Sequence, residues 1–147
     1  MLLDMYKTML SIRAFETKAA ECFTKGMLAG NIHLCIGQEA VPTGACYALE
    51  PEDYMTSTHR GHGHCIAKGA SLDKMLAELF GKKTGYCQGK GGSMHIADVA
   101  GLHSLGANGI VGAGIPIAAG SALVSKIKGD KHVTLCFFGD SASNQGT

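Results

Sequence analysis

The sequence lacks both a strong net charge and a long apolar segment. Its 147 residues carry a formal net charge of +1, and 17% of them are charged, so it has no basic stripe of the kind that binds nucleic acid or an anionic membrane surface. No apolar run reaches the ~18 residues of a membrane span. Asp4, Lys7, Arg13 and Glu16 interrupt the apolar N-terminal segment, which is unlike a signal peptide. We expect a soluble, cytoplasmic protein whose partners include neither nucleic acid nor a membrane.

The six cysteines include no C-x-x-C pair. They are spread along the chain and mostly lie among apolar residues, which is typical of reduced core thiols rather than of a disulfide framework. Glycine is missing from residues 1–25 and crowded between residues 81 and 120. This distribution predicts helices first, followed by long loops whose backbone can approach a ligand closely.

Apolar spacing and breaker residues predict the main elements. A helix is expected from about Met5 to Phe23, ending before Gly26. The other expected helices span residues 38–49, 72–80 after an N-capping Ser71, and 116–128, and the expected strands span residues 54–58 and 133–138. The last helix and strand are apolar and separated by a four-residue link, an order typical of parallel sheets. The predicted fold class is α/β, with a parallel sheet flanked by helices.

Gly139-Asp140 directly follows the expected strand at residues 133–138. Ligands of parallel sheets bind outside the carboxyl ends of the strands, so this dipeptide lies where a cofactor is expected. A magnesium ion that bridges a diphosphate takes one or two carboxylate or carbonyl oxygens from the protein, and Asp140 can provide one. Alternatively, Asp140 only caps the next helix. The residues alone leave both interpretations open.

The loop at residues 58–64 follows the expected strand at residues 54–58 and contains two glycines, Arg60 and three histidines. The Arg60 guanidinium group is suited to a phosphate, and amides between glycines can form an anion-binding nest. The rival hypothesis is a metal site made by His59, His62 and His64, as in a metallohydrolase, although no carboxylate or thiol stands at a typical ligand spacing. A purely structural loop is the third possibility.

Two further glycine-rich loops do not match known nucleotide-binding motifs. The loop at residues 85–95 has one residue too few for a P-loop and places Gly91 after Lys90. A structural loop over the active site and a ligand-binding loop are equally compatible with its composition. The loop at residues 105–116 has Ile117 where a dinucleotide fingerprint needs glycine, and no strand clearly precedes it, so NAD binding is disfavoured.

Taken in order, these motifs resemble the alpha subunit of the thiamine diphosphate-dependent 2-oxo acid dehydrogenases of the pyruvate, acetoin and branched-chain complexes. The resemblance covers nearly the whole chain. It is carried by the segments at residues 33–40, 60–63, 89–95, 109–113 and 139–146, the last of which contains Gly139-Asp140 and Asn144-Gln145-Gly146.

The resemblance implies thiamine diphosphate and Mg²⁺ as cofactors, and it implies a role for each matching residue. Asp140 is the implied magnesium ligand, and His33 is the implied catalytic residue. The implied contacts to the cofactor are His59, Arg60, and the amides of Ser141 and Ala142 at the diphosphate, with the backbone of Gly109 and Val111 at the aminopyrimidine ring. Ser141 replaces the usual glycine of the family, and His59 replaces a frequent tyrosine with a group that changes charge near neutral pH.

The resemblance also implies that residues 1–147 are the N-terminal portion of a single thiamine diphosphate-binding domain, incomplete at its C-terminus. The expected partners are a beta subunit in a heterotetramer, a lipoyl-bearing acyltransferase, and a small 2-oxo acid or acetoin as substrate. The implied reaction is cleavage or oxidative decarboxylation with acyl transfer to the lipoyl group. A truncated, non-catalytic subunit stays open as an alternative.

Overall fold

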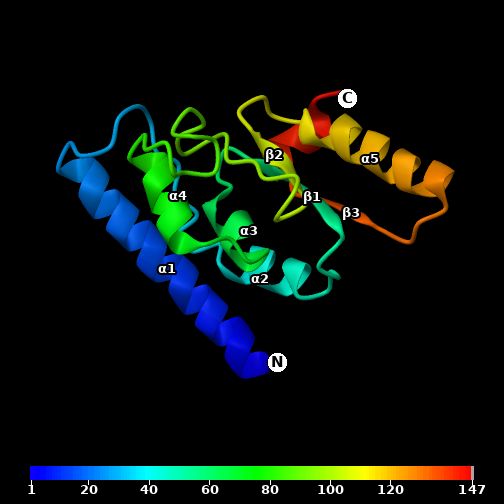
Figure 1. Ribbon diagram of the computed structural model, residues 1–147, viewed down its shortest axis with the longest axis horizontal. Coiled ribbons are helices and arrows are strands. Elements are labelled where there is room, and N and C mark those ends of the chain that lie inside the picture. The colour runs from blue at the N-terminus through cyan, green and yellow to red at the C-terminus, as the bar shows by residue number, and fades with distance from the viewer. Residues whose placement is uncertain (147) are drawn as a thin grey trace.

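The computed structural model describes residues 1–146, in which five α-helices surround a small sheet (Figure 1). In chain order the elements are α1 (Leu2–Thr24), α2 (Ala40–Cys46), β1 (Tyr54–Thr58), α3 (His62–Ala67), α4 (Leu72–Leu79), β2 (Ser104–Asn108), α5 (Gly114–Lys128), β3 (Thr134–Cys136) and the 3₁₀ helix η1 (Asp140–Asn144). Helices α1 to α4 precede the glycine-rich loops at residues 85–95 and 105–116, as expected, whereas α5 follows them.

The three strands run parallel in the order β2-β1-β3. The register pairs Met55 with Ser104 on one side and with Leu135 on the other, and a bulge separates Met55 from Ser57 in the first of these ladders. This sheet confirms the predicted α/β class. Because the strands are parallel, the segments that follow β1, β2 and β3 all leave the sheet at the same edge.

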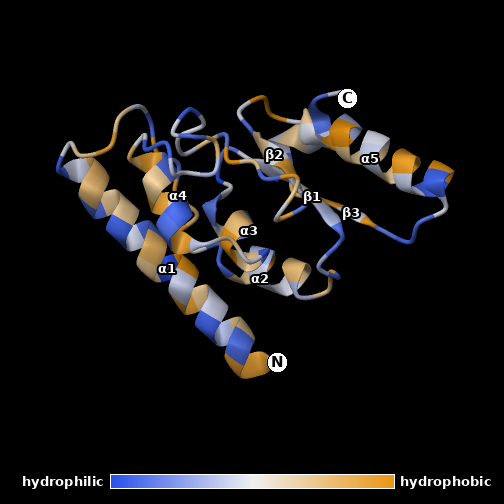
Figure 2. Cartoon of the chain, viewed as in Figure 1, coloured by the Kyte–Doolittle hydropathy of each residue, from blue (hydrophilic) through white to orange (hydrophobic). Residues whose placement is uncertain are grey.

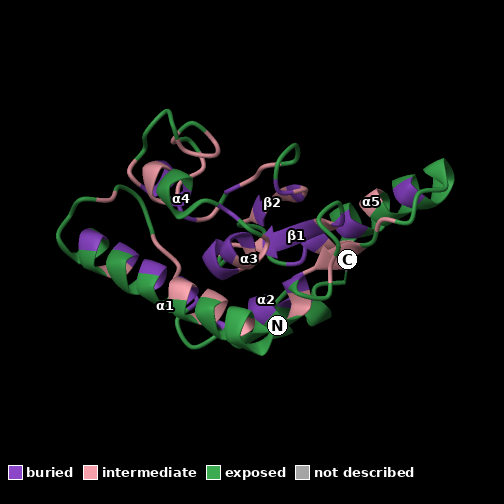
Figure 3. Ribbon diagram, turned by 60° about the horizontal axis from the view of Figure 1, so that its bottom comes forward, coloured by how far each residue is buried: buried purple, intermediate pink, exposed green. Residues whose placement is uncertain are grey.

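The helices cover the sheet in two groups. Helix α5 packs against β1 and β3, whereas α3 packs against α1 and α2. The core between these layers is made by the buried side chains of Ile12, Phe15, Met55, Met75 and Ile96 with their neighbours. Figure 3 shows the burial concentrated in β1 and α3. All six cysteines are free thiols, as predicted, and four of them are buried.

Several element boundaries differ from the prediction. Helix α2 covers only Ala40–Cys46, although Pro42 lies in its first turn as expected. Helix α5 begins at Gly114, two residues before Pro116, and it ends at Gly129 in the left-handed conformation. Strand β3 is three residues long, although hydrogen bonds to β1 also involve the residue on each side of it, from the Tyr54 N–H to the Val133 oxygen and from the Phe137 N–H to the Thr56 oxygen. Ser71 does precede α4, but its side chain makes no capping hydrogen bond.

Two elements were missed. Residues 62–67 form helix α3 where a loop was expected, and β2 precedes the third glycine-rich loop where no strand was expected. Gly63 serves close packing rather than a nest, since a Cβ there would lie 2.8 Å from the Cys35 Sγ and 3.3 Å from the Pro42 Cγ. Strand β2 contains Gly106 at φ +120°, which conceals the strand in the sequence because glycine lacks β propensity.

Helix α5 is apolar over much of its length (Figure 2) but remains largely exposed (Figure 3). Its exposed apolar side chains are Ile117, Leu123, Val124 and Ile127. Contiguous apolar surface of this kind usually lies against other protein. Across residues 1–146, no helix has the combination of length and apolar character needed to cross a bilayer.

Candidate functional site

A pocket of about 390 Å³ lies at the carboxyl edge of the sheet. Its walls come from the segments that follow all three strands, together with the segment before α2 and the first turn of α5. The lining includes Gln38, Ser57, Thr58, His64, Asn108 and Phe137 in addition to six of the eight predicted site residues, namely His59, Arg60, Val111, Asp140, Ser141 and Ala142. The position is the one that parallel sheets use for ligands.

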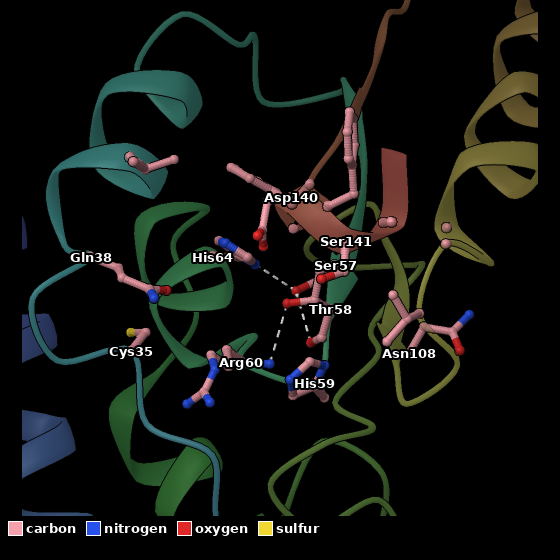
Figure 4. Close-up of a pocket in the computed structure, with 18 of the residues that line it drawn as sticks. Cys35, Gln38, Ser57, Thr58, His59, Arg60, His64, Asn108, Asp140 and Ser141 are labelled. Atoms are coloured by element: carbon pink, nitrogen blue, oxygen red, sulfur yellow. Dashed lines mark hydrogen bonds between the residues drawn. The ribbon is translucent and has the colours of Figure 1, made fainter. Parts of the chain in front are cut away.

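Asp140 is the first residue of η1, directly after the Phe137-Phe138-Gly139 segment that leaves β3. Figure 4 shows its carboxylate and the Gln38 side chain pointing into the pocket. Gly139 is the N-cap residue of η1 and Asp140 is the first residue inside it, so Asp140 is not the N-cap that was considered as an alternative. Its carboxylate is exposed and faces the ligand space.

Arg60 and His59 lie across the pocket from η1. The Arg60 guanidinium group points away from Asp140 (Figure 4) and donates from Nη1 to the Leu34 carbonyl oxygen at 2.9 Å. Arg60 is exposed, so the side chain has room to change direction. Burial lowers the pKa of His59, and the neighbouring charges of His33 and Arg60 lower it further. His59 therefore changes charge at a lower pH than the near-neutral value expected from the sequence.

His33 does not line the pocket itself. Its ring contacts the His59 ring in an edge-on arrangement with 5.1 Å between centroids, so it lies one side chain away from the ligand space. The His33 Nδ1 is buried and has no hydrogen-bond partner among residues 1–146, which is costly unless another group pairs with it. The structure thus places His33 beside the pocket, behind His59.

Val111 and Gly109 differ in their placement. Val111 lines the pocket, whereas Gly109 is outside the lining and faces the His95 ring, where a Cβ would lie 3.1 Å from the His95 Cε1. The backbone oxygen of Ala107 lies 3.4 Å from the His95 Nδ1. The loop after β2 is therefore held against the loop at residues 85–95, and only part of it reaches the pocket.

The three histidines of the rival metal hypothesis do not converge. His62 is fully buried against Glu16, His64 stacks on Phe137 with 3.8 Å between ring centroids, and His59 faces His33. Burial, together with the neighbouring His62, lowers the pKa of His64 to about 4, and its Nδ1 lies 2.7 Å from the Ser57 Oγ. Residues 1–146 contain no cluster of three or more His, Cys, Asp or Glu side chains suited to a metal. The histidine metal site is therefore wrong.

Several lining residues were missed in the sequence. Ser57 and Thr58 end a strand that was predicted with its correct bounds. Because ligands bind at the carboxyl ends of parallel strands, both residues could have been predicted to line the pocket. Gln38 stands within the motif at residues 33–40 and points into the pocket. His64 was named in the sequence only as a candidate metal ligand, and its place in the pocket, like that of Asn108, depends on the unpredicted elements α3 and β2.

The lining fits a magnesium diphosphate group. It offers one carboxylate at Asp140, one guanidinium group at Arg60, and the hydroxyl groups of Ser57, Thr58 and Ser141. Mg²⁺ is usually held by one or two protein carboxylates, with water and phosphate oxygens completing its octahedron. A single carboxylate on one wall and an arginine on the opposite wall match that ligand set once the Arg60 guanidinium group, which donates to the Leu34 carbonyl oxygen, turns toward the pocket.

A parallel sheet with a pocket at the carboxyl ends of its strands defines an α/β protein that binds a small-molecule ligand at this edge. Residues 6–147 match the family described as dehydrogenase E1 component. The chain belongs to this family.

Curated relatives share high identity with the chain over nearly its whole length. The alpha subunit of acetoin:2,6-dichlorophenolindophenol oxidoreductase from Bacillus subtilis (strain 168) is 61% identical over 143 residues, covering 97% of this chain and 43% of the relative. The subunit of the same name from Cupriavidus necator is 50% identical, covering 99% and 44%. The pyruvate dehydrogenase E1 component subunit alpha from Rhizobium meliloti (strain 1021) is 43% identical, covering 98% and 41%. The chain spans less than half the length of these relatives.

Proposed function

We propose that the chain forms the cofactor-binding part of the alpha subunit of a thiamine diphosphate-dependent dehydrogenase of the acetoin or pyruvate type. Membership in the E1 family implies thiamine diphosphate. The observation that carries the proposal for this chain is Asp140, whose carboxylate points into a pocket at the carboxyl edge of a parallel sheet. The names of the relatives support a small 2-oxo acid or acetoin as substrate.

Each pocket wall has a role in this proposal. Asp140 holds Mg²⁺, and the amides of Ser141 and Ala142 bind the diphosphate from the same wall. Arg60 and His59 bind it from the opposite wall, for which the Arg60 guanidinium group turns from the Leu34 carbonyl toward the pocket. The backbone of Val111, and of Gly109 behind it, contacts the aminopyrimidine ring.

When bound, thiamine diphosphate supplies the carbon nucleophile that attacks the substrate carbonyl. The chain orients the cofactor through the diphosphate and closes one side of the reacting centre. We also propose a catalytic role for His33 near the reacting centre, where its ring lies behind His59 and its buried Nδ1 has no hydrogen-bond partner among residues 1–146. A neutral His59 between His33 and the pocket avoids a second positive charge beside Arg60.

The remaining parts of the enzyme are proposed on the same basis. We place residues 1–147 in a single thiamine diphosphate-binding domain, completed by a beta subunit in a heterotetramer. A lipoyl-bearing acyltransferase receives the acyl group, and the complex acts in the cytoplasm. Co-purification with a beta subunit and cell fractionation test these assignments.

Binding of the cofactor to the full-length subunit assembled with its beta partner tests the central proposal. We expect thiamine diphosphate to bind only with Mg²⁺ in calorimetric titrations, and Asp140→Ala to abolish this binding because the diphosphate loses its metal anchor. Asp130→Ala, which alters an exposed carboxylate between α5 and β3, is the matched control and retains wild-type affinity.

Unchanged affinity of the Asp140→Ala variant would refute the metal assignment. Absence of binding to the wild-type assembly would instead favour the alternative of a non-catalytic subunit that keeps the fold without the cofactor. Stoichiometric zinc in the purified protein would contradict both the proposed cofactor site and the non-catalytic alternative.

A further inference from the structure

A buried chain of hydrogen bonds connects three elements that lie far apart in the sequence. The Glu16 carboxylate on α1 contacts the His62 Nδ1 on α3 at 2.9 Å, and the His62 Nε2 contacts the Ser93 Oγ at 3.0 Å. The Glu16 and His62 side chains are both 0% exposed. The Ser93 Oγ in turn accepts a hydrogen bond from the backbone N–H of His33 at 3.2 Å.

The other end of this chain reaches the same segment. The second oxygen of Glu16 accepts the backbone N–H of Cys35 at 3.0 Å. The segment at residues 31–35 is neither helix nor strand, so its backbone has no partner in regular secondary structure. Glu16 and Ser93 therefore hold two alternate amides, those of His33 and Cys35, in the way that a neighbouring strand would hold them.

One arrangement of protons satisfies all of these groups. His62 carries its proton on Nδ1 and donates to Glu16, and the Ser93 hydroxyl donates to Nε2 while it accepts from His33. Burial raises the pKa of Glu16, but the hydrogen bonds from His62 and Cys35 together lower this pKa by more, so the net shift is downward. Glu16 therefore stays ionised and accepts both N–H groups.

A polar group at full burial is a poor means of stabilising a core, because apolar residues of equal volume often do as well. The three side chains instead end on the two amides that flank Leu34, and the His33 ring contacts His59 on the pocket wall. We propose that Glu16, His62 and Ser93 are positioning residues, which fix the backbone at His33 and Cys35 and so hold the His33 ring beside the pocket. The catalytic consequence rests on the role proposed above for His33.

Amide hydrogen exchange, measured residue by residue by NMR, tests the backbone part directly. Ser93→Ala removes one hydroxyl, and we expect the His33 amide to exchange about tenfold faster while amides of β1 keep their rates. Ser121→Ala is the matched control. It removes a hydroxyl group on α5 that accepts a hydrogen bond at 2.9 Å from the Thr134 hydroxyl group on β3. It leaves the His33 amide unchanged. An unchanged His33 amide in Ser93→Ala, or an equal rise at all amides, would overturn the proposal.

Kinetics of the assembled enzyme test the consequence. Ser93→Ala is expected to lower kcat about tenfold at unchanged cofactor affinity, and Ser93→Thr, which keeps the hydroxyl, to restore it. Glu16→Gln provides a second variant, in which one oxygen remains where two accepted the His62 Nδ1–H and the Cys35 amide. If His33→Ala lowers kcat and Ser93→Ala leaves kcat unchanged, the positioning role is refuted. If His33→Ala itself leaves kcat unchanged, the proposed role of His33 fails, and the exchange rates alone decide whether Ser93 fixes the segment.

Discussion

Replacing Glu78 by glutamine should destabilise the fold strongly, because this one carboxylate organises the loop at residues 85–95. Glu78 lies on α4 and is 0% exposed. One of its oxygens accepts the amides of Cys87 at 2.8 Å and Gly89 at 2.9 Å, and the other accepts those of Gly91 at 2.7 Å and Gly92 at 3.1 Å. The loop is thus wrapped around a single side chain.

The magnitude follows from counting acceptors. In Glu78→Gln one oxygen becomes an NH₂ group, so two of the four amides lose their acceptor and face a donor. Each unsatisfied buried donor costs about 1–3 kcal/mol, and the loop amides are only partly buried. We therefore expect a loss of about 2–4 kcal/mol in the free energy of unfolding, which is a large part of the ~5–15 kcal/mol of a typical domain.

Urea unfolding followed by far-UV circular dichroism measures this loss by linear extrapolation. Glu21→Gln is the matched control, because Glu21 lies on exposed α1 surface and, among residues 1–146, pairs only with Lys18 at 3.2 Å. Its expected effect is below ~0.5 kcal/mol. Equal free energies of unfolding for the Glu78→Gln and wild-type proteins would refute the view that this carboxylate holds the loop.

Three further predictions concern the pocket and its supports. Arg60→Ala should weaken cofactor binding by roughly 1.5–3 kcal/mol, the value of a hydrogen bond to a charged group; calorimetry that shows no loss removes Arg60 from the diphosphate site. The hydrogen bond from Arg13 lowers the pKa of Glu39 from 4.5 to about 2. The ionised Glu39 carboxylate therefore contributes to the free energy of unfolding above pH 4.5, and this contribution is lost as the pH falls toward 2. Urea midpoints between pH 2 and 6 should show this loss, and Arg13→Ala should reduce it. Gly63→Ala places a Cβ 2.8 Å from a cysteine Sγ and should cost about 1–3 kcal/mol by overpacking. Gly120 lies in a helix interior and a Cβ there would have no neighbouring atom within 4 Å, so Gly120→Ala should stabilise by about 0.5–1 kcal/mol. Thermal melts that show the same shift for both variants would contradict the packing argument.

Local patterns were sufficient for elements that carry their own signals. Strand β1 has the predicted bounds Tyr54–Thr58, and α1 and α4 lie where apolar spacing and the following glycine placed them. The position of Asp140 also followed from the sequence, because a residue after a parallel strand lies at the ligand edge whatever the rest of the fold does. The pocket wall made by η1 was predictable for that reason.

Elements that depend on distant partners were not predictable. Strand β2 is a strand because Ser104–Asn108 pairs with β1, and its own residues, with Gly106 at φ +120°, favour a loop. Helix α3 is only six residues long and begins among glycines. Its formation reflects the close packing of Gly63 against the segment before α2. The pocket positions of His64, which the sequence offered only as a metal ligand, and of Asn108 depend on these two elements and were missed with them.

Two buried carboxylates, those of Glu16 and Glu78, show why a sequence can predict the burial of a charge but not its partners. Glu16 stands between Phe15 and Ala19 on the apolar face of α1, and Glu78 stands beside Leu79 on that of α4. A charge within an apolar stripe indicates a buried partner, so the burial of each was open to inference. The partners, however, are mostly backbone amides, and every residue except proline has one. Residue identity therefore cannot name the amides that a carboxylate will hold. In the loop at residues 85–95 a Cβ at Gly85 would collide with Glu78, yet Gly85 donates none of the four amides that this carboxylate accepts.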